Sequence, residues 1–170
     1  MALMSMTHSN HKTSLMAFGK DVLALMKPRI IVLLVITCLG GTLVATNGNT
    51  ALLDPLNIAL ACLGLALSAG GANMVNMWYD RDIDAVMNRT KKRPIPAGRM
   101  HHNVVLAMGV FLGLFSTAFL WVLVNEMTAL MALAGYLFYT IIYTFILKRR
   151  TVQNIVIGGA AGAFPPVVGW

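Results

Sequence analysis

The residues best suited to chemistry lie in one short stretch at 76–84, which reads NMWYDRDID. Asn76, Asp80 and Asp84 recur every four residues, so a helix would place them along one face. Aligned carboxylate and amide oxygens suit a hard divalent cation such as Mg²⁺. Zinc fits less well, because no Cys or His cluster lies nearby. The spacing therefore predicts a magnesium site with Asn76, Asp80 and Asp84 as ligands.

Basic residues follow this acidic stretch closely, namely Arg89, Lys91, Lys92, Arg93 and Arg99. Carboxylates for a metal, followed by cations for a polyanion, are the groups expected around a magnesium-bridged diphosphate. Asp82 lies half a turn off the predicted row of ligands, and we expect it to pair with Arg81 or Arg89. The simpler alternative for the whole cluster is a set of salt-bridged charges that caps a helix at the lipid headgroups.

The chain that must position these residues is strongly apolar. Of its 170 residues, 58% are hydrophobic and 11% are charged, and the mean hydropathy is +0.73, which indicates a membrane protein. Five long uncharged intervals can each supply the roughly 20 apolar residues of a membrane-spanning helix. These intervals are 30–53, 55–79, 100–125, 127–147 and 151–170. We predict an all-α, polytopic transmembrane helix bundle with five spans in this chain.

The net charge of +7 would suit a nucleic acid, but its distribution indicates membrane topology instead. All 13 Lys and Arg residues fall before the first span, between the second and third, or between the fourth and fifth. The connections around Asp54 and Glu126 contain none. The positive-inside rule therefore places the N-terminus and the acidic stretch in the cytoplasm, within a lipid bilayer and without a nucleic-acid partner.

The N-terminal residues are the most polar part of the chain. Residues 1–24 predict a flexible cytoplasmic tail, and its His8 and His11 lack further ligands nearby. Residues 1–19 contain a single lysine and no arginine, and they resemble neither a secretory signal nor a mitochondrial presequence. This pattern favours a bacterial inner (plasma) membrane.

Small residues and prolines predict how the spans meet. The run SAGGAN at 68–73 favours close approach of a neighbouring helix, and the prolines and glycine within 93–98 predict a structured loop. Only residues 125–126 join the third and fourth spans, which makes these spans antiparallel neighbours. Gly158 and Gly162, placed before a proline pair, predict a tightly packed and kinked helix.

The row Asn76-x-x-x-Asp80-x-x-x-Asp84 resembles the first aspartate motif of the intramembrane aromatic prenyltransferases, the UbiA superfamily. Longer patterns are similar to the branch of this family that farnesylates heme. They are NMWYDRDID at 76–84, RTKKRP at 89–94, YTFILKRRT at 143–151 and QNIVIGGAAGAFPP at 153–166. The resemblance extends from the region of Lys27 to the last residue.

That resemblance implies about nine transmembrane helices around a central cavity, with each helix crossing the bilayer. It implies farnesyl diphosphate and heme B as substrates, heme O as product, and Mg²⁺ held by Asn76, Asp80 and Asp84. It leaves open an association with terminal oxidase biogenesis. The side chains that it assigns to the diphosphate or to the cytoplasmic mouth of the site are Arg89, Lys91, Arg93, Tyr143 and Lys148.

One feature of the family is missing from these residues. The family has a second acidic motif in its C-terminal half, and no second Asp cluster occurs in this chain. We therefore expect residues 25–170 to be the N-terminal part of a transmembrane prenyltransferase domain and to show no turnover in isolation. Detectable heme O formation by the isolated 170 residues would contradict this expectation.

Two other functions remain open at this stage. The first is prenyl transfer to 4-hydroxybenzoate or another quinone precursor, because the acidic motif is shared across the superfamily. The second is a membrane cation transporter, although transport sites are expected near the middle of the bilayer and these aspartates lie at one boundary. A CDP-alcohol phosphotransferase is discounted, because Asp80-Arg81 and Asp84-Ala85 do not match its motif.

Overall fold

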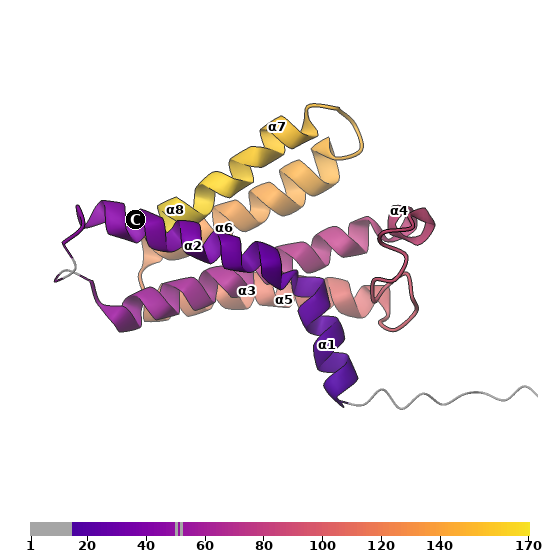
Figure 1. Ribbon diagram of the computed structural model, residues 1–170, viewed down its shortest axis with the longest axis horizontal. Coiled ribbons are helices and arrows are strands. Elements are labelled where there is room, and N and C mark those ends of the chain that lie inside the picture. The colour runs from indigo at the N-terminus through magenta and orange to yellow at the C-terminus, as the bar shows by residue number, and fades with distance from the viewer. Residues whose placement is uncertain (1–14, 50, 52) are drawn as a thin grey trace, which may run out of the picture.

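The computed structural model describes residues 15–49, 51 and 53–170. These residues form helices and connecting turns, with no strand among them (Figure 1). In chain order, the elements are α1 (Leu15–Met26), α2 (Pro28–Ala45), α3 (Pro55–Tyr79), α4 (Arg81–Val86), α5 (His102–Leu123), α6 (Glu126–Leu137), the π-helix η2 (Phe138–Leu147), α7 (Asn154–Gly158), the 3₁₀ helix η3 (Gly159–Ala163) and α8 (Phe164–Gly169). The predicted all-α class is confirmed.

Four of the five predicted spans are long and apolar enough to cross a bilayer: α2, α3, α5, and α6 continued by η2. The fifth segment, Asn154–Gly169, is apolar but shorter. Its helix begins late because Thr151 folds into a turn, in which its Oγ1 accepts a hydrogen bond from the Gln153 N–H at 3.1 Å. The count of five spans is therefore not established.

Local capping explains where the spans begin. Asp54 Oδ1 accepts from the Leu56 N–H at 3.0 Å, and Pro55 occupies the first position of α3. Asn125 Oδ1 accepts from the Thr128 N–H at 2.7 Å and starts α6 directly after α5. The predicted tight turn between antiparallel neighbours is thus present.

Small residues bring α3 and α5 into close contact, and α5 is the close neighbour that the run at 68–73 predicted without identifying it. A Cβ added at Gly71 would lie 2.7 Å from the Gly109 carbonyl oxygen, and one at Gly109 would lie 2.9 Å from that of Gly71. Of Gly158 and Gly162, which the sequence predicted to lie in a tightly packed helix, only one is closely packed. Gly158 packs against the ring of Tyr143, whereas Gly162 has open space where a side chain would lie.

Helix α1 corrects the prediction of a flexible tail through residue 24. Residues from Leu15 onward are helical. Contacts with the rest of the protein hold this helix in place, since Leu25 is fully buried and Asp21 is buried beside the loop that follows α4. Lys27 then takes a left-handed conformation, with φ 58°, so α1 leaves the bundle at an angle to α2 (Figure 1). Residues 1–14, with His8 and His11, lie outside the described residues.

The two ends of the bundle differ in charge. Figure 1 shows the junction of α1 and α2, helix α4 with its following loop, and the end of η2 at one end of the bundle. The turns that precede α3 and α6 lie at the other end. The described Lys and Arg residues therefore gather at the end that carries the acidic stretch, as the alternating charge pattern predicts.

Candidate active site

Three buried polar residues form a row where α3 passes into α4. Asn76 lies in the last turn of α3, Asp80 between the two helices and Asp84 in α4, and their exposed fractions are 2%, 6% and 4%. The Asp80 N–H donates to the Asn76 carbonyl at 3.0 Å, and the Asp84 N–H donates to the Asp80 carbonyl at 2.8 Å. The backbone therefore stays helical through the row and spaces its members by about one turn.

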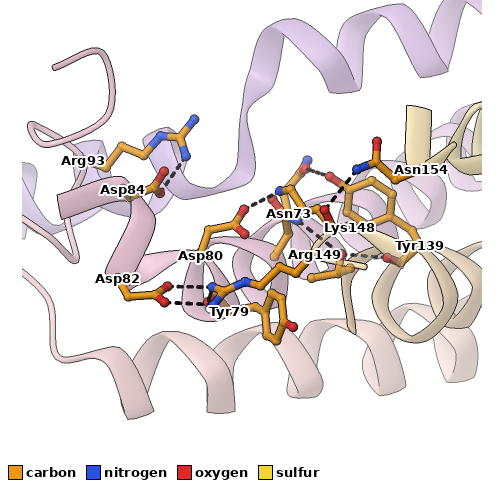
Figure 2. Close-up of polar contacts among 12 residues, drawn as sticks. Asn73, Tyr79, Asp80, Asp82, Asp84, Arg93, Tyr139, Lys148, Arg149 and Asn154 are labelled. Atoms are coloured by element: carbon orange, nitrogen blue, oxygen red, sulfur yellow. Dashed lines mark hydrogen bonds and ion pairs between the residues drawn. The ribbon is translucent and has the colours of Figure 1, made fainter. Parts of the chain in front are cut away.

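Two cations, one from the next loop and one from a distant part of the chain, meet this row (Figure 2). Lys148 Nζ, just after η2, donates to Asp80 Oδ2. Arg93 Nη1, from the loop after α4, lies 2.7 Å from Asp84 Oδ2. The other carboxylate oxygen of Asp80, Oδ1, is buried and has no hydrogen-bond partner among the described residues. One carboxylate oxygen of Asp80 is thus buried without a hydrogen-bond donor.

Asp82 lies apart from the row, as its spacing indicates, but its predicted partner is wrong. Its carboxylate binds Arg149 through two contacts of 2.6 and 2.8 Å, while Arg81 donates to the Trp78 carbonyl instead. Arg149 also stacks over the ring of Tyr79 at 4.3 Å. The hydrogen bonds from Arg149 lower the pKa of Asp82 to about 2.

The five predicted diphosphate-binding residues fall into two groups. Arg93 and Lys148 contact the acidic row, and Tyr143 lies beside Lys148, whose Nζ is 5.7 Å from the ring centroid. Arg89 and Lys91 are exposed on the loop, where Lys91 Nζ donates to Asn88 Oδ1 at 2.9 Å. The structure therefore brings three of the five together near the row and leaves two at the surface.

Two residues that sequence reasoning did not assign to the site also contact the row. Lys27 Nζ donates to Asn76 Oδ1 at 3.3 Å, and Asn76 Nδ2 donates to Thr144 Oγ1 at 3.1 Å. Burial, together with the charges of Arg93 and Lys148, lowers the pKa of Lys27 to about 8. A lysine before a proline at the start of a span equally suits a simple membrane anchor, so the sequence carried only a weak signal for it.

An apolar cavity of about 310 Å³ lies beside the row, between α2, α3, α6 and the C-terminal helices. Leu34, Leu65 and Ala69 are among its lining residues, and Asn73 and Tyr139 also line it. The Tyr139 hydroxyl donates to Asn73 Oδ1 at 3.5 Å, and Asn73 lies one turn before Asn76 on α3. The cavity therefore reaches the turn of α3 that precedes the acidic row, while Asn76, Asp80 and Asp84 are not among its lining residues.

The donor set of the row fits a magnesium ion. No group of three or more His, Cys, Asp or Glu side chains that would hold a metal occurs within 15–49, 51 and 53–170. The row instead combines two carboxylates with one amide oxygen, which are ligands that Mg²⁺ prefers over the nitrogen and sulfur ligands of zinc. The Oδ1 atom of Asp80 is the buried carboxylate oxygen of the row that has no hydrogen-bond partner among the described residues, so it is the best candidate to bind a cation.

The comparison with protein families decides the class. Residues 34–170 match the family described as "UbiA prenyltransferase family". The chain belongs to the UbiA prenyltransferase family. It is similar to the protoheme IX farnesyltransferase of Symbiobacterium thermophilum, with 55% identity over 152 residues, which cover 89% of this chain and 49% of that relative.

The chain is also similar to the protoheme IX farnesyltransferase of Acidiphilium cryptum. The identity is 52% over 154 residues, which cover 91% of this chain and 47% of the relative. A solved structure from work on digeranylgeranylglyceryl phosphate synthase in membranes shares the fold, with a TM-score of 0.72 and 22% identity over 88% of this chain and 51% of that one. The chain spans about half the length of the curated relatives it matches.

Proposed function

We propose that the full-length protein containing this chain transfers the farnesyl group of farnesyl diphosphate to a vinyl group of heme B, forming heme O and diphosphate. Relatives named protoheme IX farnesyltransferase, 55% and 52% identical to the chain, support this reaction over other prenyl transfers. One observation carries the proposal: three buried oxygen-bearing residues and three cations converge beside an apolar cavity. They are Asn76, Asp80 and Asp84 with Lys27, Arg93 and Lys148.

In this proposal, Asn76, Asp80 and Asp84 hold Mg²⁺ through their side-chain oxygens. When bound, the ion would stabilise the negative charge that develops on the bridging oxygen as the allylic carbon–oxygen bond breaks. Lys148 and Arg93 each carry several N–H donors. They can therefore keep contact with an aspartate while donating to a diphosphate oxygen.

Arg89 and Lys91 would add positive charge from the surface of the loop. Tyr143 would border the same mouth beside Lys148. Because these three side chains do not contact the acidic row, we expect them to contribute less to diphosphate binding than Arg93 and Lys148.

The apolar cavity would receive the farnesyl chain and keep water from the reacting carbon. Its volume of about 310 Å³ lies at the small end of the usual range for ligand pockets. A heme vinyl carbon would bond to C1 of the farnesyl cation, and the positive charge left on the neighbouring carbon would take up water with loss of a proton. Excluding stray water matters, because water would otherwise quench the farnesyl cation first.

We further propose that the acidic row faces the cytoplasm of a bacterial inner membrane, because the Lys and Arg residues gather at that end of the bundle. This multi-pass chain meets its substrates at one boundary, which argues against a transport path through the bilayer centre. An association with terminal oxidase biogenesis remains a prediction.

Acceptor identity is tested with membranes that contain the full-length protein, farnesyl diphosphate and Mg²⁺. Heme B and 4-hydroxybenzoate are supplied separately, and the products are separated by chromatography. We expect heme O from the first reaction and no prenylated phenolic acid from the second. Prenylation of 4-hydroxybenzoate alone would overturn the heme assignment while keeping the prenyltransferase class.

A further inference from the structure

Thr144 is the most deeply buried polar residue that contacts the acidic row, with an exposed fraction of 0%. Its hydroxyl donates to the Tyr139 carbonyl, five residues earlier, at 2.8 Å. A threonine in a helix usually bonds to the carbonyl three or four residues earlier, and Thr140, near the start of η2, still does so with Tyr136 at 2.7 Å. The five-residue step follows from the π-helical geometry of η2.

This bond commits the only proton of the Thr144 hydroxyl, so its oxygen can only accept from other groups. Asn76 Nδ2 supplies such a donor at 3.1 Å. On the other side of the amide, Lys27 Nζ donates to Asn76 Oδ1 at 3.3 Å. Because lysine has donors only, both partners favour the same orientation of the amide.

The orientation has a chemical consequence at the acidic row. Asn76 is 2% exposed, so water has little access to satisfy its amide in a rotated position. With Nδ2 held by Thr144, Oδ1 lies on the side of the amide that meets a cation, the Lys27 ammonium. A rotated amide would present hydrogen atoms there, and these cannot ligate a cation.

We propose that Thr144 is a positioning residue that keeps the amide oxygen of Asn76 turned toward the metal site, through the π-helical register of η2. This inference rests on the magnesium site of the proposed function. Residues that orient metal ligands usually contribute about 10- to 100-fold to metal affinity. Thr144 would thus act without touching either substrate.

The test measures metal binding separately from turnover. Mn²⁺ replaces Mg²⁺, inorganic diphosphate is added, and binding to the purified full-length protein is followed by electron paramagnetic resonance. Thr144→Val keeps the shape of the side chain but removes the acceptor, and we expect it to weaken Mn²⁺ binding about tenfold. Thr144→Ser retains a hydroxyl and should restore binding.

Thr140→Val is the matched control, because Thr140 is also buried in η2 but bonds to the Tyr136 and Leu137 carbonyls and not to Asn76. It should bind Mn²⁺ as the wild type does. Equal binding by wild type and Thr144→Val, equal weakening by Thr140→Val, or no Mn²⁺ binding by the wild type would each overturn the inference. Wild-type protein that binds Mn²⁺ but makes no heme O would overturn the proposed reaction and leave the role of Thr144 testable by the same variants.

Discussion

Arg99 Nε lies 2.9 Å from Oδ1 and 3.1 Å from Oδ2 of Asp21, so an ion pair ties helix α1 to the loop that follows the acidic row. Arg99 Nη2 also donates to the Lys92 carbonyl at 3.2 Å, directly before Arg93. The Asp21 side chain is largely buried in this contact, with an exposed fraction of 10%. Helix α1 therefore helps to hold the loop that presents Arg93 to Asp84.

Asp21→Asn should loosen that loop. The substitution removes the charge of the carboxylate, and because the Arg99 side chain is 45% exposed, solvent limits the contribution of the pair to about 1 kcal/mol. We expect faster trypsin cleavage in the loop between α4 and α5 of the full-length protein. Asp54→Asn, at the opposite end of the bundle, should leave that cleavage rate unchanged.

The double variant Asp21→Arg with Arg99→Asp reverses the pair and should recover part of the protection. Cleavage at the wild-type rate in Asp21→Asn would show that the ion pair does not restrain the loop.

Gly71→Ala should lower the thermal stability of the helix bundle. The new Cβ would lie 2.7 Å from the Gly109 carbonyl oxygen, a backbone atom that moves only if α3 and α5 separate. Overpacking of this kind costs about 1–3 kcal/mol. The midpoint of thermal unfolding in detergent, followed by circular dichroism, measures the effect.

Gly40→Ala is the control for this substitution, because a Cβ at Gly40 in α2 meets no atom within 4 Å. Its midpoint should stay the same or rise, since alanine favours a helix over glycine. Equal losses in the two variants would refute the close contact between α3 and α5.

Ala69→Phe should change which prenyl diphosphate is accepted. Ala69 lines the apolar cavity, so a phenyl ring would occupy space proposed for the farnesyl chain. We expect turnover of farnesyl diphosphate to fall about tenfold or more, because a change of a few apolar groups in a pocket alters discrimination by about that factor. Geranyl diphosphate, which is shorter, should lose less.

Ala59→Phe places the same ring on an exposed position of the same helix and should preserve farnesyl transfer. If Ala69→Phe leaves farnesyl transfer unchanged, the cavity does not hold the chain.

The Asp82–Arg149 pair should stabilise the protein in a pH-dependent manner. Hydrogen bonds from Arg149 lower the pKa of Asp82 to about 2, below its value in an unfolded chain of about 3.9. The contribution is therefore complete above about pH 4 and is lost as the pH falls toward about 2. Because the Asp82 side chain is 60% exposed, solvent and salt reduce the effect.

The thermal midpoints of wild type and Asp82→Asn should accordingly differ slightly near neutral pH and converge in acid. A difference that grows as the pH falls would contradict the sign of the pKa shift.

Much of this architecture follows from the sequence alone. Hydropathy predicted five spans, and four of them are long and apolar enough to cross a bilayer, because an apolar segment in lipid must satisfy its backbone hydrogen bonds as a helix. The four-residue spacing placed Asn76, Asp80 and Asp84 in one helical row. The small residues at 68–73 predicted a close helix neighbour for α3, and the structure identifies that neighbour as α5.

Other features depend on contacts between residues far apart in the chain. The burial of Asp21 arises from the loop that carries Arg99, and the partner of Asp82 lies 67 residues away at Arg149. The proposed role of Thr144 depends on a π-helix, whose register is not indicated by any spacing in the sequence. Charge pairing and hydrogen-bond orientation therefore required the structure.

We propose that Asp80 belongs to the catalytic site of a heme farnesyltransferase in the full-length protein. Membranes with the full-length protein, heme B, farnesyl diphosphate and Mg²⁺ are compared for wild type, Asp80→Asn and Asp82→Asn. We predict heme O from wild type, a loss of about 100-fold or more in Asp80→Asn, and near-normal formation in Asp82→Asn, whose carboxylate lies off the row. Heme O formation by Asp80→Asn at the wild-type rate, or an equal loss in both variants, would contradict this role of Asp80.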